Sequence, residues 1–303
     1  MSDESSVARA AEGVQVAGGE QAVPLAGQFL LERLSAFETS LAEVGPRLLS
    51  PADERAVHDL RVALRRTRTL LEVGRTVLGR FHADEVRSAL RDVQRTSGVL
   101  RDEEVVLEIV TSLTILGADA RPEVSAGVKA WIDSRRRRER RLRSGLRRKI
   151  REGELERGRR LLTALVAFRT KPSRDKRLTK FARRAVEDAR REVERRRAGP
   201  LQEPEALHSL RIAYKRLRYT VEAFAMVLPD ELAGLAQPAA RLQGRLGKLH
   251  DVDMVIACVK AARHLADAAR DALMVELERL RQDRAAAFEK DATPIAPPPT
   301  RPI

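Results

Sequence analysis

The sequence predicts an all-α protein built of two related helical halves. Three observations lead to this fold class: apolar residues recur at helical spacing along most of the chain, no segment shows sustained β alternation, and one helical motif occurs twice. The 303 residues include 43% apolar and 34% charged residues but only 3% aromatic ones. We therefore expect a core of Leu, Val, Ile and Ala beneath solvated helix faces.

The first half, residues 24–170, should contain five helices, which end near residues 44, 78, 116, 150 and 168. The pair Gly45-Pro46 should end the first helix, because both residues disfavour a helix interior. Ser50 is suited to cap the second helix, with Pro51 in its first turn. A bend is expected at Gly98 in the third helix.

The second half, residues 171–290, begins at the stretch RTKPSRD (169–175), which is the best candidate for a boundary between the halves. Its helices should cover residues 176–197, 204–228, 230–265 and 268–290. Both ends of the chain are expected to be disordered. Residues 1–23 are acidic and rich in Gly and Ala, and residues 291–303 contain a cluster of prolines.

The motif that occurs twice reads VHDLRVALRRTRTLLE from Val57 and LHSLRIAYKRLRYTVE from Leu207. Its identical positions are His58/His208, Leu60/Leu210, Arg61/Arg211, Ala63/Ala213, Arg66/Arg216, Arg68/Arg218 and Glu72/Glu222. A second pair follows in the same order, GVLRDEEV from Gly98 and GKLHDVDM from Gly247. Two paired motifs in one order indicate an internal duplication, because chance similarity between amphipathic helices would reproduce the leucines but not the His, Arg and Glu positions.

Each copy of the helix places its basic residues on one stripe, because each residue turns by about 100°. The stripes are His58, Arg61, Arg65 and Arg68 in the first copy and His208, Arg211, Lys215 and Arg218 in the second. Like charges one turn apart, about 5.4 Å, repel each other. A polyanion along the stripe would relieve this repulsion and gain charge-assisted hydrogen bonds. The stripes therefore predict a polyanion site, with a solvated basic face as the alternative.

The charge balance favours the same class of partner. The formal net charge is +14, and arginine supplies most of the 58 basic residues. Such an excess attracts polyanions, and the planar guanidinium binds phosphate oxygens in pairs. Nucleic acid remains the main alternative partner, through the phosphates of a duplex. The low aromatic content argues against stacking of single-stranded bases, and nothing resembles a zinc finger, a basic zipper or an RNA-binding sheet motif.

Several classes of function lack a signal in the sequence. It contains no Gly-rich phosphate loop, no GxSxG motif and no clustered metal carboxylates, so we expect no catalytic activity and no cofactor. No histidine pair has metal-ligand spacing, so no metal is expected. The lone Cys258 fits a reducing compartment, and no apolar run of about 18 residues or signal peptide is present. We therefore expect a cytoplasmic protein without a membrane span.

The densest basic segment is SRRRRERRLRSGLRRKIR, from Ser134 to Arg151. Its charges surround the helix, although Trp131, Leu142 and Leu146 supply a weak packing stripe. This segment could extend the polyanion site, bind nucleic acid or remain a solvated face. We expect a solvated or auxiliary role.

The repeated motifs, together with LGKLHDVDMVI, resemble the signatures of the CHAD family, the conserved histidine α-helical domain. The resemblance covers about residues 24–290. It implies two antiparallel helical bundles related by pseudo-two-fold symmetry. It also implies that basic helices facing a central groove bind inorganic polyphosphate, and some members associate with polyphosphate granules.

By position, the resemblance implies that polyphosphate is bound by His58, Arg61, Arg65, Arg68, Arg101, His208, Arg211, Lys215, Arg218, Lys248 and His250. The first half departs from the second, because Arg101 stands where the second half has His250. This substitution keeps a hydrogen-bond donor. The acids that follow, Asp102 and Asp251, are expected to hold neighbouring cations or to cap a helical turn.

Overall fold

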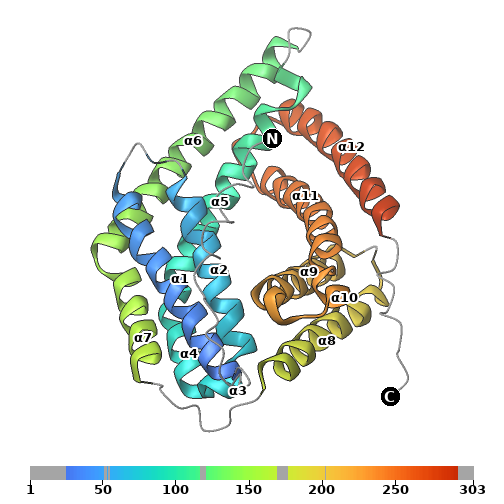
Figure 1. Ribbon diagram of the computed structural model, residues 1–303. Helices are drawn as coiled ribbons and strands as arrows, with labels where there is room; N and C mark the ends of the chain where they lie inside the picture. The colour runs from blue at the N-terminus through green and yellow to red at the C-terminus, as the bar shows by residue number, and fades with distance from the viewer. Residues whose placement is uncertain are drawn as a thin grey trace.

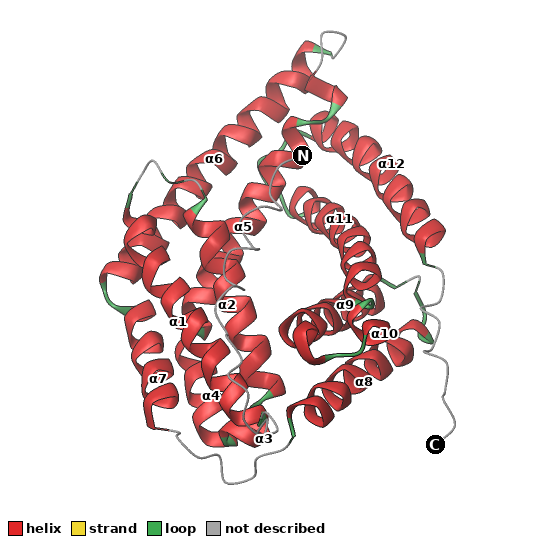
Figure 2. Ribbon diagram, viewed as in Figure 1, coloured by secondary structure: helices red, strands yellow, loops and turns green. Residues whose placement is uncertain are grey.

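The computed structural model describes residues 25–50, 53, 55–116, 121–168, 177–201 and 203–292. In this part of the chain all regular structure is helical, apart from one isolated β-bridge between Leu25 and Arg177 (Figure 2). The all-α prediction is therefore confirmed. The predicted boundary at 169–175, the tail 1–23 and nearly all of the tail 291–303 lie outside the described residues.

The first half contains seven α-helices and a short 3-10 helix within the described residues. They are α1 (Ala26–Leu49), α2 (Ala56–Val73), α3 (Arg75–Leu78), α4 (Arg80–Ala89), α5 (Arg91–Thr111), η2 (Thr114–Leu116), α6 (Pro122–Arg151) and α7 (Glu154–Phe168). The second half follows with α8 (Leu178–Arg197), α9 (Pro204–Phe224), η3 (Ala225–Val227), α10 (Asp230–Ala233), α11 (Ala236–Lys260) and α12 (Asp267–Asp291).

The start of α2 differs from the prediction at two places. Gly45-Pro46 does not end the first helix, because α1 continues through Pro46 to Leu49. Val44 and Leu48 are buried on either side of the proline, so core packing outweighs the hydrogen bond that the proline cannot donate. Ser50 does not cap α2. The Asp53 carboxylate takes this place and accepts hydrogen bonds from the backbone N–H groups of Arg55 and Ala56 at 3.1 and 2.9 Å.

Two further helices are divided where the sequence predicted continuity. The helix α5 continues through Gly98 without interruption, and the predicted helix is instead divided at Leu90, between α4 and α5. Leu90 is fully buried, so packing fixes the break. The helix predicted over 230–265 is divided into α10 and α11 at Gly234 and Leu235. Hydrophobic periodicity is insensitive to interruptions of one or two residues.

The two halves repeat one pattern of helix contacts (Figure 1). In the first half α2 packs against α1 and α5, and α5 packs against α6. In the second half α9 packs against α8 and α11, and α11 packs against α12. The halves meet where α2 contacts α9 and α5 contacts α11. This correspondence agrees with the implied pseudo-two-fold arrangement, while the gene duplication itself stays a prediction.

Two apolar clusters hold these central helices, and each draws on both halves of the chain. The larger one includes Phe29 of α1, Phe181 of α8 and Phe224 of α9. The ring centroid of Phe224 lies 5.5 Å from that of Phe29 and 5.8 Å from that of Phe181. The smaller one lies among α5, α6, α11 and α12 and includes Trp131 and Val255. Among the described residues, no helix is both long and apolar enough to cross a membrane.

Candidate polyanion-binding site

The repeated motifs lie on helices that pack together at the centre of the molecule. The first copy forms most of α2 and the second most of α9, and these two helices contact each other (Figure 1). Leu60 and Leu64 of α2, with Leu210 and Leu217 of α9, are fully buried on the core side. The basic stripes lie beside this core side and keep partial exposure.

Six side chains of the two stripes form what we name the central basic cluster: Arg61, Arg65 and Arg68 of α2, with Arg211, Lys215 and Arg218 of α9. Lys215 demonstrates that the stripes converge. Burial, and then the positive charges of four arginines from both helices, lower the pKa of Lys215 to about 8. Charges that shift each other's pKa in this way lie close together.

A tyrosine connects the two stripes. Tyr219 of α9 is buried, and its ring lies beneath two guanidinium groups. The distance to the ring centroid is 4.9 Å for Arg65 of α2 and 5.4 Å for Arg218 of α9. Cation–π attraction holds both arginines over one ring. The sequence analysis did not identify Tyr219, because the repeat alignment places Thr69 opposite it and the residue lies outside the basic stripe.

In the described part of the chain, the core of the cluster forms no direct ion pair with a carboxylate. Among the described residues, Arg61, Arg65, Arg211 and Lys215 have no carboxylate within ion-pair distance. In addition, the buried Nε atoms of Arg65 and Arg211 have no hydrogen-bond acceptor. Burial lowers the pKa of all four groups, because the charged form loses solvation. Partly buried cations that form no direct ion pair favour the binding of an external anion.

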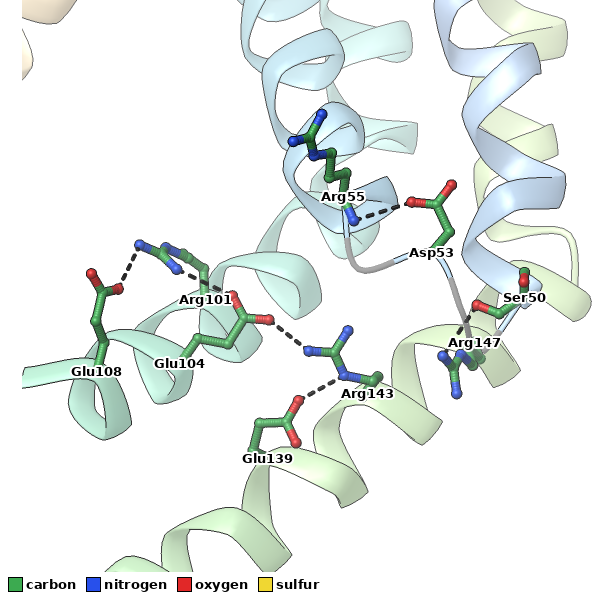
Figure 3. A network of polar contacts seen from close by, with 9 residues as sticks. All are labelled: Ser50, Asp53, Arg55, Arg101, Glu104, Glu108, Glu139, Arg143 and Arg147. Atoms are coloured by element: carbon green, nitrogen blue, oxygen red, sulfur yellow. Dashed lines mark hydrogen bonds and ion pairs between the residues drawn. The ribbon is translucent and has the colours of Figure 1, made fainter. Parts of the chain in front are cut away.

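The outer members of the predicted set are neutralised. Arg218 pairs with Glu222, four residues further along α9, at 2.6 Å. Arg101 of α5 pairs with Glu104 at 3.4 Å and Glu108 at 3.3 Å (Figure 3). Arg101 is therefore less available to an anion than the core arginines are.

Two aspartates lie beside the cluster. The positive charges of Arg61 and Arg211 act on Asp102 of α5, and those of Arg211 and Arg101 act on Asp251 of α11. Burial nevertheless raises the pKa of both carboxyl groups. Neither carboxylate forms an ion pair or a cap among the described residues, so the expectation that they hold cations by direct contact is wrong. They act on the arginines only through longer-range attraction.

The histidines of the motifs do not occupy equivalent surroundings. In the second half, Nδ1 of His208 lies 3.5 Å from Nδ1 of His250, and the ring centroids are 4.7 Å apart. Burial, followed by the charges of Arg211 and His208, lowers the pKa of His250 to about 4. His58 of the first half is exposed. No group of three or more His, Cys, Asp or Glu residues in the described chain is placed to hold a metal.

The remaining predicted residues lie at the margins. Arg68 donates a hydrogen bond to Oε1 of Gln94 on α5, and the charges of Arg87 and Arg91 act on it. Lys248 is exposed on α11. The structure thus gathers the arginines, Lys215 and the pair His208/His250 near one another, and it shows no contact of His58 or Lys248 with the cluster.

Comparison with known proteins identifies the family. A family model, the CHAD domain, matches residues 34–260. The fold is similar to that of the CHAD domain from the plant Ricinus communis, with a TM-score of 0.66 and 16% identity over 92% of both chains. It is also similar to PptA from Streptomyces chartreusis, with a TM-score of 0.64 and 17% identity over 88% of this chain and 99% of the other. A search of curated proteins gives no match.

At such identities the solved structures establish the shared fold alone. The family model, however, spans most of the chain, including all the predicted site residues and both repeated motifs. The protein therefore belongs to the CHAD domain family.

Proposed function

We propose that this protein binds inorganic polyphosphate at the central basic cluster and leaves it chemically unchanged. One observation carries the proposal. Arg61, Arg65, Arg211 and Lys215 converge from two helices, and no carboxylate within ion-pair distance neutralises them among the described residues. A linear phosphate chain between α2 and α9 would meet cations from both sides. Each of its phosphates would accept charge-assisted hydrogen bonds, which are about twice as strong as neutral ones.

Membership of the CHAD family and the residues on α2 and α9 support the same ligand. In the cell, we propose that the protein is cytoplasmic and is recruited to polyphosphate granules. A fluorescent fusion should then colocalise with the granules, and it should become diffuse in cells that make no polyphosphate.

Competition distinguishes polyphosphate from nucleic acid as the ligand of the cluster. We expect labelled long-chain polyphosphate, bound to the purified protein, to be displaced by unlabelled polyphosphate but not by duplex DNA at equal phosphate concentration. A flexible thread can follow the basic stripes of two neighbouring helices closely, whereas a duplex contacts the protein only along its outer surface. Displacement by both competitors with equal potency would contradict the proposal. The same mixtures with Mg²⁺ or Mn²⁺ test the non-catalytic part, because steady release of orthophosphate would refute it.

The pH dependence of binding should report Lys215. A bound polyanion favours the protonated form, so it raises the pKa of Lys215 above the value of about 8 in the free protein. Binding above pH 8 therefore requires proton uptake, and affinity should fall as the pH rises from 7 to 9.5. The fall should approach tenfold per pH unit between the free and bound pKa values. Below pH 7, where Lys215 is already protonated, this contribution is constant.

The variant Lys215→Arg serves as the control, because arginine stays charged throughout this range. Isothermal titration calorimetry in buffers of different ionisation enthalpy measures the proton uptake directly. The decline between pH 7 and 9.5 should be lost in Lys215→Arg. An unchanged decline would show that another group titrates.

A further inference from the structure

Helix α6 has two faces of different character. Its inner face is neutralised by acids: Arg135 and Arg138 pair with Glu103 of α5 at 2.6 and 3.0 Å, and Arg143 pairs with Glu104 at 2.9 Å (Figure 3 shows the last pair). Arg147 on the same helix donates hydrogen bonds to the backbone carbonyls of residues 48 and 50. Much of the basic segment is thus structural, which accounts for its placement against α1 and α5.

The outer face carries arginines that the fold does not use. These arginines, which we name the α6 arginine strip, are Arg137, Arg140, Arg141 and Arg148, and all four are exposed. Among the described residues, the first three have no ion-pair partner, and Arg148 has only Glu152 at 3.7 Å, with both side chains largely exposed. At about 100° per residue these positions share one arc of the helix of about 100°, opposite Arg135.

The surface between these arginines forms a wide, open depression. A depression of about 570 Å³ is lined by the strip together with Ser144 and Gly145, and by residues of α6 alone. A Cβ atom at Gly145 would meet no other atom within 4 Å, so packing does not require glycine there. Glycine in a helix interior costs stability. Its absent side chain leaves the backbone open between Arg141 and Arg148, beside the hydroxyl group of Ser144.

We propose that the α6 arginine strip is a second polyanion site, separate from the central basic cluster, and that it binds the phosphate backbone of duplex nucleic acid without sequence preference. The strip extends about 16 Å along the helix axis. A duplex presents about one charge per 1.7 Å of its axis, or roughly ten phosphate charges over this length. The arginine forks and Ser144 are suited to phosphate oxygens.

The shape of the strip favours a duplex over polyphosphate. All lining residues belong to one helix, so a thin flexible chain would meet cations from one side only and would lose its conformational freedom for few contacts. A duplex is stiff over this length, with a persistence length of about 150 base pairs, and it loses little such freedom. It can lie against the exposed helix α6 without contacting α2 or α9.

The test measures binding of a fluorescent 20-base-pair DNA duplex to the full chain over a series of salt concentrations. Native protein should show a log–log salt slope near −3.6, the value for about four phosphate contacts. The variant R137E/R140E/R141E/R148E should bind the duplex at least about 30-fold more weakly, with a slope near zero. Its neutral counterpart, R137Q/R140Q/R141Q/R148Q, should show a smaller loss of duplex affinity. Unchanged circular dichroism of both variants controls for folding.

A charge-matched control is R184E/R241E/R263E/R279E, which reverses four exposed arginines elsewhere on the described surface. Its affinity for the duplex should stay within about threefold of the native value, because contacts at the strip contribute more to this affinity than the net charge of the protein does. Equal losses in both variants would overturn the proposal. So would retained duplex binding in the strip variant, or tight binding of polyphosphate at the strip in place of DNA.

Failure of duplex binding at the α6 arginine strip can be distinguished from failure of polyphosphate binding at the central basic cluster. Reversal of the strip should leave polyphosphate binding at the central basic cluster intact. Reversal of the cluster should leave duplex binding intact. A strip variant that loses polyphosphate and keeps the duplex would refute this inference, regardless of what occupies the cluster.

Discussion

Reversal of four charges in the central basic cluster, in the variant R61E/R65E/R211E/R218E, is expected to weaken binding of long-chain polyphosphate by roughly 1000-fold or more. Each charge-assisted hydrogen bond to phosphate contributes about 1.5–3 kcal/mol, and the new carboxylates add repulsion. The losses are not additive, because the four arginines share one ligand. Fluorescence anisotropy or calorimetry with a defined chain length measures the effect.

Two controls separate the loss of contacts at the cluster from the general effects of the charge change. The variant R184E/R241E/R263E/R279E carries the same change in net charge outside the cluster and should lose less than about tenfold. The neutral variant R61Q/R65Q/R211Q/R218Q avoids buried carboxylates and should show an intermediate loss. Undiminished affinity in the reversed cluster, with helicity preserved in circular dichroism, would reject the site.

The substitution Glu103→Ala is expected to lower the free energy of unfolding by about 3–5 kcal/mol. The Glu103 side chain is 3% exposed and pairs with Arg135 at 2.6 Å and Arg138 at 3.0 Å. Burial raises the pKa of its carboxyl group, while these two arginines oppose the shift. Removal of the carboxylate would leave the Arg135 guanidinium, 16% exposed and stacked over Trp131, without a counter-charge.

Urea denaturation followed by circular dichroism measures this loss. Glu108→Ala is the matched control, because Glu108 lies on the same helix and pairs with Arg101 but is 70% exposed. Exposed pairs contribute only about 0–1 kcal/mol. Equal stabilities of the two variants would show that the contact between Glu103 and α6 is not what holds that helix in place.

The sequence predicted the elements that carry the site because the signal there is redundant. On α2 and α9, the spacing of the apolar residues, the spacing of the basic residues and the repetition of the motif all indicate the same helix. Once both helices form, helix geometry places Arg61 and Arg65 on one stripe of α2, and Arg211 and Lys215 on one stripe of α9. The structure adds that these helices contact each other. That contact depends on long-range packing, which a periodic pattern does not encode.

Other features could not be predicted, because they depend on neighbours distant in sequence. Pro46 remains inside α1 because Val44 and Leu48 are buried. Tyr219 supports Arg65 from the opposite half, and it has no counterpart in the first copy. The arginines of α6 divide into paired and exposed sets only because Glu103 and Glu104 of α5 lie on one side. A count of charges along the segment does not separate the two sets.

The most direct test of the central claim is a crystal structure of the native protein with a short polyphosphate of defined length. We expect continuous phosphate density along α2 and α9, with oxygens within hydrogen-bond distance of Arg61, Arg65, Arg211 and Lys215. Phosphate density confined to other surfaces, with these four side chains left without contacts to it, would show that polyphosphate does not bind at the central basic cluster.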